Sequence, residues 1–135
     1  NAMGAYVADR VIRLMMQNDV AVNNAKVLVL GLTFKEDCPD LRNSRVIDVV
    51  NEFTGLGMNV DVFDPWADLE QAKSAYNITL TDQPENNTYD AIVLTVAHEA
   101  FKTLGASEIR KWGKGTHVLF DTKGALPGHA VDGRL

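Results

Sequence analysis

At 135 residues, with 46% hydrophobic and 23% charged residues, the chain has the size and composition of one globular domain with its own core. No apolar run approaches the roughly 18 residues that a membrane span needs, and the formal net charge of -5 argues against nonspecific nucleic-acid binding, which requires surplus Lys and Arg. The single cysteine, Cys38, excludes an internal disulfide; it fits a reducing cytoplasm and, with a buried thiol, fits an oxidising compartment almost as well. We expect a protein that contacts neither membrane nor nucleic acid, and of the two compartments we expect the cytoplasm.

The N-terminal segment predicts a helix and a linker. Residues 1–2, ahead of Met3, are typical of what a cleaved expression tag leaves, and they are excluded from the fold prediction. Residues 4–17 carry apolar side chains at helical spacing, and the Asn-rich residues 18–24 mark a linker. The apolar face of this helix is wide, so the helix either packs on the following domain alone or also contacts a second surface.

Strand and helix patterns alternate through the rest of the chain. In chain order they predict strand 26–34, helix 44–56, strand 59–64, helix 67–76, strand 78–81, strand 91–96, helix 101–112 and strand 116–121. For the helix 44–56 we expect Asn43 or Ser44 as the N-cap and Gly57 just beyond the end. The repeated strand-helix-strand units predict an α/β fold, a Rossmann-like, doubly wound parallel sheet of about five strands preceded by the end of a long helix.

In such sheets, ligands bind beyond the carboxyl ends of the strands, where the strand order reverses. With the usual order 3-2-1-4-5, this point lies between the first and fourth predicted strands. The residues presented there are Thr33, Phe34, Lys35, Ala97, His98, Thr122 and Lys123. Two lysines beside an aromatic ring predict a ligand with an anionic group and a flat or apolar part, such as a nucleotide diphosphate.

The first strand-to-helix connection is long and charged. Residues 35–43 separate the strand from the helix, whereas about 2–6 residues are usual. Up to Arg45 the cations and anions balance, so the loop is not a generic anion trap. Arg42, just before a helix start, could present a bidentate guanidinium to a phosphate. Alternatively, Arg42 pairs with Asp40 or Glu36 in a solvated loop.

This connection lacks the dinucleotide fingerprint G-x-G-x-x-G, which also needs an acidic residue about 20 positions later. Gly31 is followed by Leu-Thr-Phe, and Asp64 lies 33 residues beyond it. We therefore reject a standard NAD site in this domain and expect Asp64 to end a strand and start a turn.

The cysteine and histidine patterns predict neither a nucleophile nor a metal site. Cys38 has no motif partner and is interpreted as an incidental loop thiol. His98 ends a predicted strand, where it could polarise a ligand or cap the helix that starts near Glu99. The histidines at 98, 117 and 129 lack metal-ligand spacing, so we expect no metal.

The stretch GLTFKEDCPDLRNSR, residues 31–45, resembles the C-terminal, UDP-binding domain of the UDP-glucose/GDP-mannose dehydrogenase family, whose pattern is G-L-[TA]-F-K-x-x-x-x-D-x-R-x-S. The residues in register are Gly31, Phe34, Lys35, Asp40, Arg42 and Ser44, and later matches are Asp64-Pro65, His98 and Asp121-Thr122-Lys123-Gly124. Residues 3–7 resemble the end of the family's long central helix. The Cys-Pro-Asp-Leu-Arg-Asn variant is more similar to the UDP-N-acetylhexosamine (GlcNAc or GalNAc) 6-dehydrogenases of bacterial surface-polysaccharide (Vi or O-antigen) synthesis than to the UDP-glucose enzymes.

The resemblance implies a parent enzyme that oxidises the sugar C6 alcohol to a carboxylate in two NAD-dependent steps. It implies that Phe34, Lys35 and Lys123 contact the UDP-sugar, with Lys123 standing where relatives often carry Arg. Arg42 would reach the NAD, which is bound mainly by an N-terminal domain absent here. The catalytic cysteine also lies upstream in the family, so Cys38 is not that residue. We expect no catalytic residue in this chain and no activity from it alone.

The resemblance also divides the chain. Residues 3–24 would be the end of the central, dimerisation helix and a linker, and residues 25–135 the UDP-binding C-terminal domain. The implied partners are a UDP-sugar, the NAD-binding domain of the same enzyme and a second copy of the chain. Two alternatives stay open: a UDP-glucose or GDP-mannose dehydrogenase domain, and a non-catalytic Rossmann-like module whose loop serves a protein partner.

Overall fold

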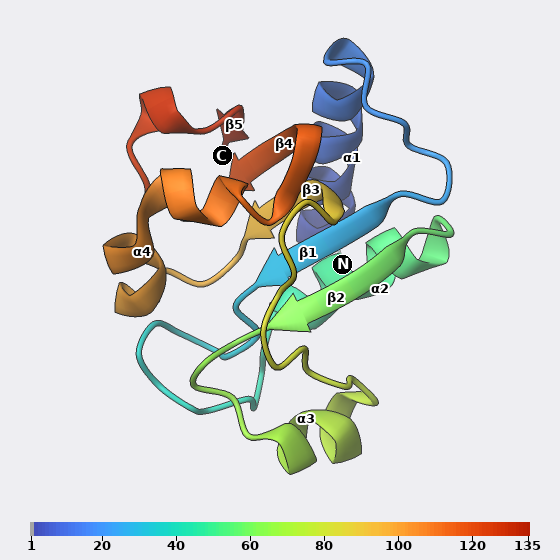
Figure 1. The fold of residues 1–135 in the computed structure, drawn as a ribbon. Coiled ribbons are helices and arrows are strands. Elements are labelled where there is room, and N and C mark those ends of the chain that lie inside the picture. The colour runs from blue at the N-terminus through green and yellow to red at the C-terminus, as the bar shows by residue number, and fades with distance from the viewer. Residues whose placement is uncertain (1) are drawn as a thin grey trace.

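The computed structural model describes residues 2–135, so Asn1, half of the expected tag remnant, lies outside the described residues. Figure 1 shows one parallel sheet, in the order β2-β1-β3-β4-β5, flanked by helices. The strands are β1 (Lys26–Leu30), β2 (Asn59–Phe63), β3 (Tyr89–Leu94), β4 (Gly113–Asp121) and β5 (Gly133–Arg134). The helices are α1 (Ala2–Gln17), α2 (Val46–Gly55), α3 (Leu69–Tyr76) and α4 (Glu99–Arg110), with a short 3-10 turn η1 (Gly128–Ala130). The predicted Rossmann-like α/β class is confirmed.

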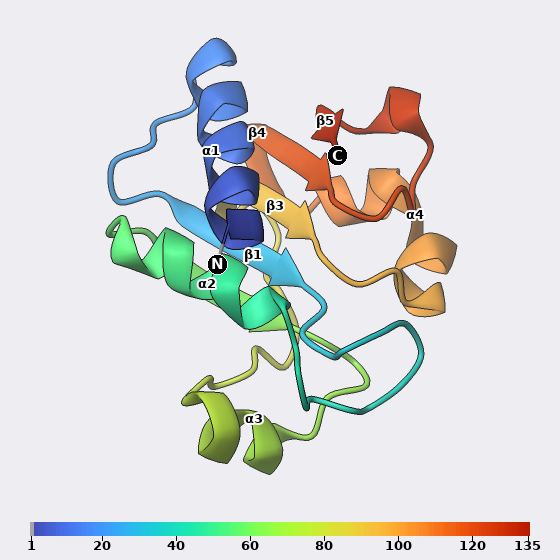
Figure 2. The same ribbon diagram turned by 180° about the vertical axis from the view of Figure 1, so that it is seen from behind.

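Side chains alternate between the two faces of the sheet, and each face has its own hydrophobic core. On one face Val29 and Val93 pack in a core shared with α1 and α2, and on the other Leu30 and Ile92 pack in a core shared with α4. Figure 2 shows α1 and α2 together on the same face. The central strands β1 and β3 are buried on both faces, which explains their continuous apolar runs.

The helix α1 packs on the sheet of its own domain. Val7, Val11 and Met15 are buried in the core shared with α2. The two helices approach so closely that a Cβ on Gly4 would lie 2.7 Å from the backbone oxygen of Asp48. Packing on the following domain therefore accounts for the buried part of the wide apolar face. Within residues 2–135, none of the helices has the length and apolar character that crossing a bilayer requires.

The prediction of a third strand at residues 78–81 is wrong. In the described chain this segment shares a single backbone hydrogen bond with β2, from Thr81 N–H to Val62 O at 2.7 Å. Asn77 turns the chain out of α3 in a left-handed conformation (φ 58°), and Pro84 follows soon after, so the segment is too short for a ladder. The fifth strand is instead β5, whose two residues pair with the end of β4. The order of the other four strands is as predicted, and it reverses between β1 and β3.

Several predicted boundaries also differ. The strand β1 ends at Leu30, because Gly31 (φ 104°) turns the chain out of the sheet. The expected N-cap of α2 is wrong: the capping position is Arg45, without a side-chain bond, and the Ser44 hydroxyl donates to the Leu32 carbonyl at 2.6 Å. Gly57 does follow the end of α2 with a positive φ of 85°. The helix α4 begins at Glu99 and is broken by a non-helical glycine at 105.

Candidate functional site

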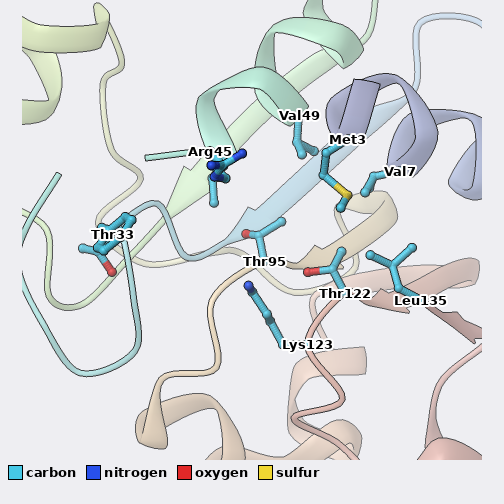
Figure 3. Close-up of a pocket in the computed structure, with 11 residues that line it drawn as sticks. Met3, Val7, Thr33, Arg45, Val49, Thr95, Thr122, Lys123 and Leu135 are labelled. Atoms are coloured by element: carbon cyan, nitrogen blue, oxygen red, sulfur yellow. The ribbon is translucent and has the colours of Figure 1, made fainter. Parts of the chain in front are cut away.

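A cavity of about 190 Å³ lies beyond the carboxyl ends of β1, β3 and β4, at the point where the strand order reverses (Figure 3). Its polar lining consists of Thr33, Arg45, Thr95, Thr122 and Lys123, and its apolar lining of Met3, Val7, Phe34, Val46, Val49 and Leu135. In Figure 3 the Lys123 ammonium extends toward Thr95. The cavity therefore combines hydroxyls, cations and an apolar wall.

The cavity forms where the ends of β1 and β3 part. The Thr95 hydroxyl lies 2.9 Å from the Leu30 carbonyl and 2.7 Å from the Gly31 carbonyl, and donates to them. Gly31 has a φ of 104°, and a Cβ there would come within 2.6 Å of the Val96 Cβ. Only glycine fits this conformation and this close approach. Gly31 is thus required for the backbone to turn at the cavity. This turn does not need the two further glycines of the dinucleotide fingerprint, which the sequence lacks.

Two cations line the cavity, Arg45 and Lys123. In the part of the chain that the structure describes, neither forms an ion pair with a carboxylate. Both charges are therefore free to meet an anionic ligand. Lys35, predicted to face the same crevice, is exposed but does not line the cavity, whereas the neighbouring Phe34 does line it and is 51% exposed.

The loop after β1 is closed by its own hydrogen bonds. The Phe34 N–H donates to the Asp40 carbonyl at 2.7 Å. Arg42 binds the Asp40 carboxylate through Nε at 3.1 Å and a terminal nitrogen at 3.3 Å, and its side chain is 84% exposed. The Arg42 guanidinium lowers the pKa of Asp40. Of the two alternatives for Arg42, the structure shows the solvated ion pair. Cys38, in the same loop, is a free, half-buried thiol.

The buried carboxylate of Asp64 joins three loops at this edge of the sheet. One oxygen accepts from the N–H groups of Leu32 at 2.6 Å and Thr33 at 3.0 Å, and from His98 Nε2 at 3.0 Å. The other accepts from the N–H of Trp66 at 2.7 Å. Burial by itself raises the pKa of Asp64, but these hydrogen bonds outweigh it and hold the pKa below 3.8. The expected turn at Asp64-Pro65 is present, and Asp64 also anchors the loop after β1.

His98 occupies the N-cap position of α4, as one of its two interpretations had it, but its side chain makes no capping hydrogen bond. Its ring is completely buried, and Asp37 caps the helix instead, its carboxylate accepting from the Glu99 N–H at 2.9 Å. His98 is also not among the residues that line the cavity. It therefore belongs to the support of the loop and not to the ligand surface.

Asp121, also fully buried, holds the loop after β4. Its two oxygens accept from the N–H groups of Lys123 at 2.9 Å and Leu126 at 2.8 Å. The Thr122 hydroxyl donates to the Leu94 carbonyl at 2.9 Å, which ties this loop to β3. These bonds fix the backbone from which Lys123 reaches the cavity.

Sequence reasoning missed Arg45. It was counted only in the charge balance of the loop, because nothing in its local pattern distinguishes it from Arg42. Its place in the lining depends on long-range bonds of the loop, such as the one from Ser44 to Leu32. One signal in the sequence could have indicated Arg45. It stands just before a predicted helix start that faces the crevice, and groups at such a helix start lie close to a bound anion.

A family model described as the UDP-glucose/GDP-mannose dehydrogenase family, UDP binding domain, matches residues 28–128. The chain belongs to this family. The matched region contains residues 28–30 of β1 and all of β2 to β4, and therefore the strand ends and loops that build the cavity. The predicted membership is confirmed.

Two relatives in this family cover the chain nearly from end to end. The chain is 47% identical over 135 residues to a UDP-N-acetyl-D-glucosamine 6-dehydrogenase of Pseudomonas aeruginosa, covering 100% of the chain and 32% of the relative. It is 44% identical over 133 residues to an enzyme of the same name from Salmonella typhi, covering 98% of the chain and 31% of the relative. The chain thus spans about a third of the length of these relatives.

Two solved structures of dehydrogenases share the fold. An NDP-N-acetyl-D-galactosaminuronic acid dehydrogenase from Methanosarcina mazei Go1 superposes with a TM-score of 0.79 at 24% identity, over 92% of this chain and 26% of that one. A UDP-N-acetyl-mannosamine dehydrogenase from S. aureus superposes with a TM-score of 0.71 at 26% identity, over 95% of this chain and 28% of that one.

Proposed function

We propose that this chain binds the UDP part of a nucleotide sugar, as one domain of an NAD-dependent 6-dehydrogenase. The observation that carries the proposal is the cavity at the reversal point of a sheet of this family, lined by Arg45 and Lys123 without carboxylate partners among the described residues. Charged nitrogens bind the oxygens of a diphosphate strongly. The hydroxyls of Thr95 and Thr122 and the apolar wall suit the polar and flat parts of a nucleoside.

Within this proposal Lys123 and Arg45 bind the diphosphate. Phe34, which lines the cavity, and the exposed Lys35 next to it in the chain contact the sugar side of the ligand. Arg42 lies outside the cavity lining and points its charge to solvent, paired with Asp40. This location suits a contact with NAD held by another domain, for which Arg42 would exchange one anionic partner for another.

The substrate we propose is a UDP-N-acetylhexosamine, because the two relatives above 40% identity are both named as UDP-N-acetyl-D-glucosamine 6-dehydrogenases. The reaction would convert the C6 alcohol to a carboxylate, with NAD as the hydride acceptor. These 135 residues carry no G-x-G-x-x-G, and no cysteine is among the described residues that line the cavity, so the chain alone should be inactive. NADH formation from a UDP-sugar by the purified chain would overturn this part. A cytoplasmic bacterial enzyme of polysaccharide synthesis is the setting we propose.

We further propose that α1 mediates a homodimer. Its packing on the sheet leaves Met3, Tyr6 and Met16 exposed by 48%, 52% and 66%. A second copy of the chain packed on this helix would remove these apolar side chains from water. Sedimentation equilibrium should show a dimer that Tyr6→Glu weakens, and a monomer at every protein concentration would contradict the proposal.

Calorimetric titration of UDP into the chain tests the proposed binding. We expect saturable binding that Lys123→Ala weakens by about tenfold, the usual effect of losing one charged hydrogen bond to phosphate. The matched control is Lys111→Ala. Lys111 is exposed, pairs with Glu108 and follows α4, at the opposite end of the strands, so its loss should leave UDP affinity unchanged. If wild type and both variants fail to bind UDP, the protein-interaction module becomes the better explanation.

A further inference from the structure

His98 is a buried polar side chain that the proposed ligand contacts do not use. Its exposure is 0%, and its ring contacts the rings of Trp66 and Phe101, at centroid distances of 6.4 and 5.5 Å. A polar ring enclosed in this way must satisfy both nitrogens within the protein. Both do find partners, and those partners lie on different loops.

The hydrogen bonds determine which ring nitrogen carries the proton. His98 Nδ1 lies 2.9 Å from the backbone N–H of Asp37, which can only donate, so Nδ1 is the acceptor. Nε2 lies 3.0 Å from the Asp64 carboxylate and therefore carries the hydrogen. The Thr33 hydroxyl, 3.3 Å from Nε2, is left to donate to the Lys35 carbonyl at 3.0 Å.

These contacts hold the loop on both sides of the proposed ligand residues. Thr33 and Asp37 bracket the segment that carries Phe34 and Lys35, and both contact the His98 ring. Asp37 has a left-handed backbone (φ 53°), which a non-glycine residue keeps only with support from its surroundings.

We propose that His98 is a positioning residue: its Nδ1 anchors the Asp37 N–H, and through it the segment that presents Phe34 and Lys35 to the nucleotide sugar. The effect of this anchor on the binding of the nucleotide sugar rests on the proposed function, whereas the anchoring of Asp37 does not. Holding the segment in place before the ligand arrives removes an ordering cost from binding.

Two variants separate the two ends of the ring. His98→Asn places an amide oxygen near the position of Nδ1 and keeps the Asp37 anchor, while it loses the bond to Asp64. His98→Gln places an amide nitrogen near the position of Nε2 and keeps the bond to Asp64, while it loses the anchor. A purely structural histidine would make both variants lose UDP affinity in parallel with stability.

Amide hydrogen exchange without ligand tests the anchor directly. In His98→Gln the Asp37 amide should exchange at least about tenfold faster, as expected for a lost hydrogen bond, whereas in His98→Asn it should stay within about threefold of wild type. The Trp66 amide, bound to the other Asp64 oxygen, is the internal reference. Equal Asp37 protection in wild type and His98→Gln would overturn the proposal.

Nitrogen-15 spectra of wild-type His98 add a test that needs no variant. They should show an unprotonated Nδ1 and a protonated Nε2, and the opposite tautomer would overturn the anchor. In the calorimetric titration His98→Gln should bind UDP-N-acetylglucosamine about fivefold more weakly than His98→Asn. If wild type binds no UDP ligand at all, the proposed function fails, while exchange and spectra still decide the role of His98.

Discussion

Gly31 and Val96 lie so close together that a Cβ on Gly31 would be 2.6 Å from the Val96 Cβ. This contact sits where β1 and β3 part, directly beneath the cavity that Thr33 and Thr95 line. The shape of the cavity therefore depends on the backbone of one glycine. Since the same glycine has a positive φ of 104°, both conformation and space exclude a side chain there.

Gly31→Ala should lower the free energy of unfolding by at least about 2 kcal/mol, because it adds backbone strain and a clash with Val96. Urea denaturation followed by circular dichroism measures the change. Gly55→Ala is the control, since a methyl group on Gly55 would meet nothing within 4 Å and the residue has no positive φ. Because Gly55 is the last residue of α2, this substitution should leave stability unchanged or raise it by up to about 1 kcal/mol. Equal effects of the two substitutions would contradict the role given to Gly31.

Asp64→Asn should destabilise the protein by about 2 kcal/mol, because an amide nitrogen would face N–H donors that the carboxylate now accepts. The Asp64 side chain is completely buried, and His98 Nε2 and the Leu32 and Thr33 N–H groups converge on one oxygen. Asp82→Asn, at an exposed position, should change the free energy of unfolding by less than about 0.5 kcal/mol. A similar loss in both would show that Asp64 does not anchor the loops.

The same carboxylate predicts a pH dependence. Its folded pKa lies below 3.8, so its contribution to stability is complete above that value and is lost as the pH falls from 3.8 through the folded pKa. The wild type should therefore lose stability more steeply than Asp64→Asn in this acid range. Asp40, whose pKa Arg42 lowers, is the comparison. Its ion pair with Arg42 is exposed, so Asp40→Asn should hardly change the dependence of the free energy of unfolding on pH. High salt screens this pair and should make the change smaller still.

The central strands were predictable because burial on both faces leaves an uninterrupted apolar run such as that of β1. Residues 78–81 have the same short alternation as a strand, and only the three-dimensional structure shows that they share one hydrogen bond with β2. The strand β5 has two residues, too few for any periodicity. Periodic burial could be read from the sequence, whereas pairing at the sheet edges could not.

The candidate site, like the fold, could be predicted from the sequence only in part. Phe34 and Lys123 could be placed at the cavity from the rule that ligands meet the carboxyl ends of the strands. Arg45, and the anchoring of Asp37 by His98, depend on hydrogen bonds between residues more than ten positions apart in the chain, such as the bond from Ser44 to Leu32. The sequence pattern around each of these residues does not indicate such long-range bonds.

Arg45→Ala and Arg42→Ala should affect UDP binding differently. Arg45 lines the cavity, so its loss should weaken UDP binding about fivefold to tenfold, whereas Arg42 lies outside the lining and its loss should leave binding unchanged. The difference should shrink as salt rises, because a partly exposed charge is screened. Calorimetry at two salt concentrations measures both effects. A larger loss from Arg42→Ala would move the proposed phosphate contact from the start of α2 to the loop.

Mapping the bound ligand tests the account most directly. In a nitrogen-15 NMR titration of the wild-type chain with UDP, we predict saturable amide shifts grouped at Thr33, Thr95, Thr122 and Lys123, around the cavity at the reversal point of the sheet. Shifts grouped instead along the groove between α2 and the segment after α3, at Asn51, Asp61 and Thr81, or no saturable shift at all, would contradict a UDP site at the carboxyl ends of β1, β3 and β4.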